Sequence, residues 1–135
     1  MERQGFRILA DLAKLGIPYP RGILARRSFV NRSPDIAEKT LRALVESIDF
    51  TNNPDNKAAG MRSLARWLRL PKVEDAEPGY ELMKGLFRRR IYPNAVGLRY
   101  IIRLLGKSNE QIRRLKAEDI VDDRIVRKLE KEGLF

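Results

Sequence analysis

The chain has 135 residues, which suits one domain of ordinary size and is too short for two. It has no cysteine and no histidine, so disulfides, thiolate metal sites, cysteine nucleophiles and imidazole bases are excluded. Lysine and arginine total 28 against 18 acidic residues. The formal net charge of +10 favours an anionic partner, which is nucleic acid, an anionic membrane surface or an anionic solute.

No apolar stretch approaches the about 20 residues that a membrane-spanning helix needs. Residues 1–5 (MERQG) lack the apolar core of a signal peptide. Taken alone, the sequence therefore predicts a chain that stays in the cytoplasm.

Two short strands are expected near the amino terminus. Residues 6–12 (FRILADL) begin with alternating apolar and polar positions, and residues 22–25 (GILA) form a short apolar run. Between them, Pro18 and Pro20 exclude regular helix, because each proline lacks an amide donor and restricts the residue before it.

Two helices are predicted to begin at a polar residue followed by proline. Ser33 is expected to cap the first helix, and Pro34 suits its first turn, where the missing N–H costs nothing. The second helix starts at Asn53 and Pro54 and ends by Pro71. The apolar face of the first helix is expected to be Ile36, Ala37, Leu41, Leu44, Val45 and Ile48. In the second, Met61, Leu64, Ala65 and Leu68 gather on one side and Arg62, Arg66 and Arg69 on the other.

The rest of the chain is also predicted to be helical. Residues 73–86 form a helix that Pro78 and Gly79 break or kink. Asn94 caps a further helix that ends at Gly106, and a short helix covers residues 110–115.

The final helix is expected to run from Asp122 and Asp123 to Glu132, with Gly133 as its terminator. Adjacent carboxylates suggest a metal or acid–base pair, but at a helix start they are far more often caps. We therefore predict no metal site, no cofactor and no catalytic residue, and we expect that the protein is not an enzyme.

Several short segments follow one another in order along nearly the whole chain. They are residues 5–12, 16–20 (GIPYP), 22–25, 28–30 (SFV), 33–35 (SPD), 53–54 (NP), 92–93 (YP) with Gly97, 118–123 (EDIVDD) and 133–135 (GLF). Together they resemble the solute-binding proteins of bacterial ABC importers, of the nitrate, sulfonate, taurine and thiamine-precursor type. No segment is specific by itself; their order and spacing carry the resemblance.

The resemblance implies the carboxy-terminal part of a two-lobed periplasmic-binding-protein type II fold, whose lobes close about a hinge over the solute. Residues 1–20 would form the end of the second lobe and the hinge crossing, and residues 21–135 the helical part of the first lobe. The expected fold class is α/β and predominantly helical, with two short strands followed by four or five helices.

The resemblance also implies partners and a location. The partners are a small-molecule solute, bound by the whole protein, and an ABC permease in the membrane, with no nucleic acid expected. The location is periplasmic, or extracellular with a membrane anchor. Tyr19 and Arg21 flank the implied crossing and are the predicted ligand-binding residues, since an arginine there suits a sulfonate, nitrate or phosphate oxygen. The competing interpretation is that Pro18 and Pro20 only shape a turn that leaves both side chains in water.

An alternative function follows from the charge alone. A basic helical module would bind nucleic acid or an acidic protein through Arg88, Arg89 and Arg90 or through the arginine side of the second helix. One tryptophan and four tyrosines are too few and too scattered for a base-stacking platform, so a solvated helix face is favoured for these arginines. This alternative explains the charge but not the ordered segments.

Overall fold

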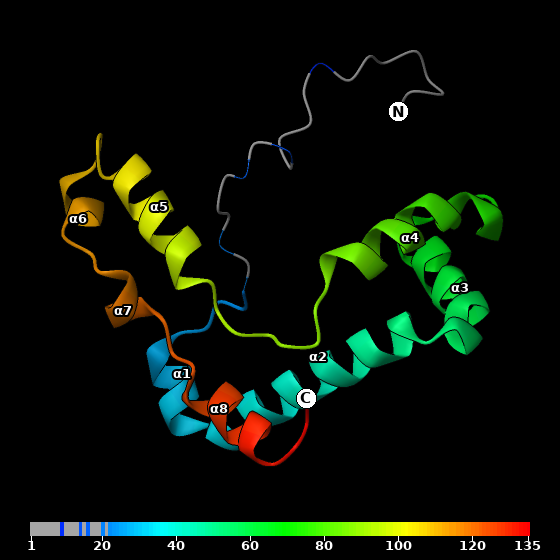
Figure 1. The fold of residues 1–135 in the computed structure, drawn as a ribbon, viewed down its shortest axis with the longest axis horizontal. Helices are drawn as coiled ribbons and strands as arrows, with labels where there is room; N and C mark the ends of the chain where they lie inside the picture. Colours follow the sequence, from blue (N-terminus) through cyan, green and yellow to red (C-terminus); the bar gives the residue numbers. More distant parts are fainter. Residues whose placement is uncertain (1–8, 10–13, 15, 17–19, 21) are drawn as a thin grey trace. The chain divides into compact units, whose positions relative to one another are not determined.

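The computed structural model describes Leu9, Lys14, Gly16, Pro20 and residues 22–135. All regular secondary structure in these residues is helical (Figure 1). The predicted α/β fold class is therefore wrong, and the described chain belongs to the helical class. Residues 22–25 are irregular rather than a strand, with the Leu24 side chain 96% exposed and no neighbouring strand among the described residues to pair with. The strand expected at residues 6–12 lies outside the described residues, apart from Leu9.

The described residues divide into two units, each of which is considered by itself. The larger unit contains residues 24–92 and 123–135, and the smaller contains residues 93–122 with the described residues before Leu24. The predicted boundary at residue 20 falls where little of the chain is described, and it stays a prediction. The helices of the larger unit are α1 (Arg27–Arg32), α2 (Pro34–Asn52), α3 (Lys57–Leu68), α4 (Glu77–Leu86) and α8 (Arg124–Lys131), with 3₁₀ turns η3 (Pro54–Asn56) and η4 (Val73–Ala76). Those of the smaller unit are α5 (Ala95–Leu105), α6 (Glu110–Arg113) and α7 (Ala117–Ile120).

The predicted helices begin where the sequence indicates, but their capping hydrogen bonds differ from the prediction. Pro34 lies in the first turn of α2, but Ser33 makes no side-chain capping bond, and only its carbonyl accepts the Ala37 N–H at 3.2 Å. At η3 it is Asn53 that caps with its side chain, by accepting the Asp55 N–H at 3.0 Å. Pro78 falls in the first turn of α4, where proline is tolerated, so the expected break separates η4 from α4.

The core of the larger unit is small and lies where α2 meets α4 and α8. Val45 and Leu129 are fully buried, and Tyr80 is almost so. The Tyr80 hydroxyl donates to the Thr51 carbonyl at 2.7 Å, which ties α4 to the end of α2. Helix α3 lies directly against this ring, because a Cβ added at Gly60 would be 2.5 Å from Tyr80 Cε2.

A network of four charged side chains joins α2 to α8. Glu38 accepts from Lys128 at 2.6 Å and from Arg42 at 2.9 Å, and Arg42 also pairs with Glu132. The hydrogen bond from Lys128 is the main reason that the pKa of Glu38 is lowered, with the Arg42 bond second. The same bond raises the pKa of Lys128, so each group holds the other in its charged form.

The end of the chain packs back on the segment that precedes α5. The rings of Tyr92 and Phe135 meet edge to face, with centroids 6.4 Å apart and planes at 87°. The Tyr92 hydroxyl donates to Glu130 at 2.6 Å, which raises the pKa of that tyrosine. Gly133 ends α8 with a φ of 78°, a left-handed conformation that glycine adopts without cost, as predicted for the terminator.

Candidate functional site

The predicted ligand-binding pair, Tyr19 and Arg21, lies outside the described residues. The structure therefore brings neither residue to a site and leaves their role a prediction. The features that can be described are three groups of basic residues: the arginine triplet before α5, the arginine side of α3, and a set around α5, α6 and α7.

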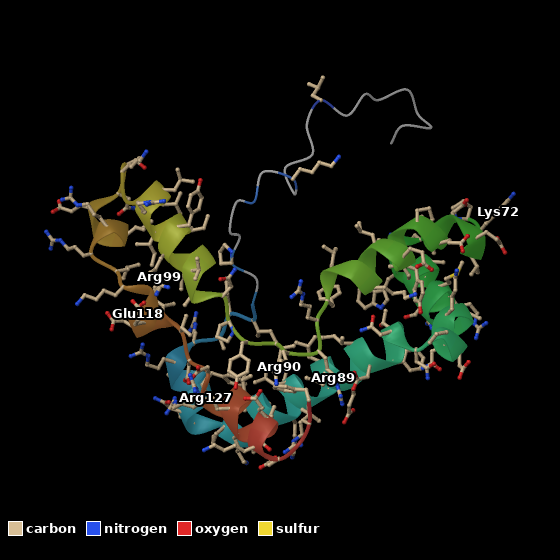
Figure 2. All side chains as sticks on the ribbon, in the orientation of Figure 1. Lys72, Arg89, Arg90, Arg99, Glu118 and Arg127 are labelled. Carbon is tan, nitrogen blue, oxygen red and sulfur yellow. The ribbon has the colours of Figure 1, made fainter. Side chains whose placement is uncertain are left out.

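Two members of the arginine triplet have structural partners within the larger unit. Arg89 pairs with Asp49 of α2 at 3.0 Å, and Arg90 approaches Glu130 of α8 at 3.4 Å (Figure 2). A cation held by a carboxylate contributes less to binding an external anion, because part of its field is already balanced. Arg89 and Arg90 consequently tie this segment to α2 and α8, which makes the triplet a weak candidate for binding phosphate.

The arginine side of α3 has no ion-pair partner in the part of the chain that the structure describes. Arg62 and Arg66 are exposed, and Arg69 follows the last turn with a φ of 53°. These side chains belong to one helix and its end, and they do not line the hollow described below. They match the interpretation as a solvated helix face.

The third group lines a hollow in the smaller unit. Its volume is about 620 Å³, and all of its walls come from the smaller unit. The wall residues are Arg99, Ile102, Arg103, Gly106, Lys107, Arg113, Leu115, Lys116, Ala117 and Glu118. We call this the basic hollow; five of its side chains are basic and one is acidic.

Local sequence signals set the walls of the basic hollow in place. Asn94 caps α5 by accepting the Gly97 N–H at 3.0 Å, which confirms that prediction. Asn109 caps α6 by accepting the amide of Gln111 at 3.0 Å and that of Ile112 at 3.2 Å. At Gly106 a Cβ would lie 3.0 Å from Arg113 Cα, so the glycine lets the end of α5 and α6 approach closely. The caps therefore stabilise the start of each helix, and the glycine lets the two helices pack closely.

Only part of the charge in the basic hollow is balanced. Arg99 of α5 pairs with Glu118 of α7 across the hollow (Figure 2). The pKa of Glu118 is lowered, first by the hydrogen bond from its own backbone amide and then by Arg99. Arg113 shares Glu110 with a neighbouring arginine, at 3.3 Å from its own guanidinium. These contacts account for two of the five basic wall residues.

Arg103, Lys107 and Lys116 form no ion pair among the described residues, although Lys116 lies close enough to Glu118 to help lower the pKa of that carboxyl. The Arg103 guanidinium lies over the Tyr100 ring, 5.6 Å from its centroid, which orients the side chain without neutralising it. Lys107 and Lys116 are exposed. Sequence reasoning missed this site, because its cations come from a helix end, a loop and a helix start that only the fold brings together.

The acidic residues of the described chain offer no metal centre. No group of three or more acidic residues among the described positions is arranged to hold a metal ion. Asp123 stands at the start of α8 but makes no side-chain capping bond, and instead pairs with Arg127 at 2.8 Å (Figure 2). Asp123 therefore forms an ion pair with Arg127, one turn further along α8, in place of the predicted capping bond.

Comparisons of the chain with protein-family models, with curated proteins and with solved structures found no match in any of the three. In the part of the chain described, no helix is long and apolar enough to cross a bilayer.

Proposed function

We propose that the chain is the helical part of a solute-binding protein that serves an ABC importer. In the whole protein it would help to capture a small anion such as a sulfonate or nitrate, or a thiamine-precursor-like molecule, for delivery to a membrane permease. Its place of action would be the periplasm or the outer face of the membrane. The observation that carries the proposal is the series of short segments, in family order, along nearly the whole chain.

One contact in the fold links two of the segments on which the resemblance rests. Tyr92 belongs to the YP segment and Phe135 to the terminal GLF segment, and their rings pack edge to face. A joint structural role is a physical reason for two such distant segments to occur together. The hydrogen bond from Tyr92 to Glu130 also ties the YP segment to α8, the helix that precedes the GLF segment.

The distribution of apolar side chains also supports a part of a larger protein. Only eight hydrophobic residues are buried among those described, and three of these are alanines. Large apolar side chains stay exposed on α3, α4 and α5, and Trp67 is 84% exposed. A folded protein seldom leaves so many large apolar groups in water, so we expect further polypeptide of the same protein to cover them.

Solute binding by the native gene product tests the proposal. The experiment is a thermal-unfolding series with taurine, an alkyl sulfonate, nitrate and a phosphorylated pyrimidine as separate ligands, at constant ionic strength. Ligand that binds only the folded protein raises the melting temperature in a concentration-dependent way. We expect one ligand class to do so, and an unchanged melting temperature with every ligand contradicts the proposal.

The basic helical module remains as a second candidate, supported by the arginine side of α3. Its test is a titration of single-stranded and double-stranded DNA and RNA into the chain at rising salt. A module of this kind gives tight binding whose logarithm falls steeply and linearly with the logarithm of salt concentration. Absence of binding at low salt removes this candidate and leaves solute capture untouched.

A further inference from the structure

We propose that the basic hollow is a binding site for a multivalent oxyanion, of which inorganic phosphate is the simplest form. The site differs from the predicted pair Tyr19 and Arg21 and does not rest on solute capture. It needs only α5, α6 and α7, whose wall residues all belong to the smaller unit.

The unbalanced charge is the first part of the argument. Arg103, Lys107 and Lys116 line one hollow, and none of them forms an ion pair among the described residues; only Lys116 lies near a carboxylate, that of Glu118. Cations held close together repel each other, and an anion with two or more charges relieves that repulsion better than separate monovalent ions. Guanidinium and ammonium groups both donate charge-assisted hydrogen bonds to oxyanions.

The rigidity of the walls is the second part. Asn109 caps the start of α6, and Gly106 lets the end of α5 lie close to Arg113 of α6. The ion pair between Arg99 and Glu118 joins α5 to α7 (Figure 2). The cations are thus presented from three elements that are already connected, so binding an anion need not order the backbone.

Glu118, the one acidic residue of the basic hollow, allows a test in which the affinity for phosphate should rise. Glu118 repels an incoming anion, while its pairing with Arg99 reduces the positive field. Replacing Glu118 with glutamine removes the charge but keeps the shape of the side chain and an oxygen that can still accept the hydrogen bond from Arg99. The affinity of the hollow for phosphate should therefore rise in this variant.

Calorimetric titration of inorganic phosphate into the native gene product, in a low-salt amine buffer, is the direct experiment. The wild-type protein should give saturable binding. The double variant Lys107→Gln/Lys116→Gln should weaken phosphate about tenfold or more, since it removes two charge-assisted hydrogen-bond donors. Glu118→Gln should strengthen it by about threefold, given ordinary screening at a surface site.

The matched control is Arg62→Gln/Arg66→Gln, which removes the same charge from α3 outside the hollow. It should change the phosphate affinity less than about twofold. Equal losses in the two double variants, or no saturable binding by the wild type, overturn the proposal. If phosphate binds elsewhere, for example as the captured solute, the affinity stays the same in the hollow variants, and the oxyanion site is refuted while solute capture stands.

Discussion

Gly60 of α3 lies close to the buried ring of Tyr80 in α4. Gly60 lies in α3 with the Tyr80 ring so close that a Cβ would reach 2.5 Å from Cε2. The sequence shows Gly60 as a lone glycine within a helix, where it weakens the helix relative to alanine. Nothing in the sequence shows that its neighbour is an aromatic ring from α4, because that depends on how two helices pack.

Gly60→Ala should destabilise the chain despite its gain in helix propensity. The methyl group collides with a buried ring, and overpacking of this kind costs about 1–3 kcal/mol against about 1 kcal/mol gained. The control is Gly85→Ala in α4, where no atom lies within 4 Å of the new Cβ. Urea unfolding should show a lower midpoint for the first variant and an equal or higher one for the second. A stabilised Gly60→Ala variant contradicts the packing of α3 on Tyr80.

Tyr80→Phe isolates the hydrogen bond between α4 and α2. The variant keeps the buried ring and removes the donor to the Thr51 carbonyl. We expect a loss of about 0.5–1.5 kcal/mol in the free energy of unfolding, the usual contribution of one such bond. Urea unfolding measures it, and an unchanged midpoint shows that water replaces the hydroxyl without loss.

At the scale of elements, the sequence predicts most of the helices and misses the rest for physical reasons. Proline and asparagine at helix starts are local signals, so α2, α3 and α5 are found from sequence. Helices α1 and α7 are short and have no side-chain cap, so no local signal announces them. The strand expected at residues 22–25 fails because an apolar run becomes a strand only beside a partner, which the sequence of one segment does not reveal.

The candidate sites also combine features that the sequence predicts with features that only the fold reveals. An arginine triplet is visible in the sequence, but its carboxylate partners lie about forty residues away along the chain, on α2 and α8. The basic hollow combines cations that are separated along the chain by other residues, so it has no linear motif. Charge predicts that an anion is attracted, and only the fold indicates where.

The ion pairs between α2 and α8 should make stability depend on pH in the acidic range. The pKa of Glu38 is below its ordinary value of 4.5 in the folded chain. Its contribution is therefore complete above pH 4.5 and is lost as the pH falls through the folded value. We expect Glu38→Gln to lower the urea midpoint at pH 7 and to show a weaker loss of stability between neutral and acidic pH.

Glu46→Gln is the control for this effect. Glu46 is exposed on the same helix and has no ion pair in the described structure. Its variant should keep the wild-type acid profile. Identical profiles for the wild type and Glu38→Gln would show that the network adds nothing to the stability of the α2–α8 contact.

At the scale of the whole molecule, the exposed apolar residues raise the question of whether further polypeptide covers them. Trp67 is 84% exposed in α3, and Leu82 of α4 is 63% exposed. If more polypeptide covers them in the native gene product, Trp67→Ala should lower its stability by about 3 kcal/mol, as for a buried large side chain. In the isolated 135-residue chain the same change should cost less than about 0.5 kcal/mol. Equal, small effects in both proteins mean that nothing covers this face.

The mass of the native gene product tests the central proposal most directly. An antibody against α8 should detect it in extracts of the source cells, and mass spectrometry of the captured protein gives its length. Solute capture predicts one polypeptide much larger than the 15.6 kDa of this chain, with a strand-rich sequence on its amino-terminal side. A native product of 15.6 kDa that contains only these residues would contradict it, and the basic helical module would then be the better account.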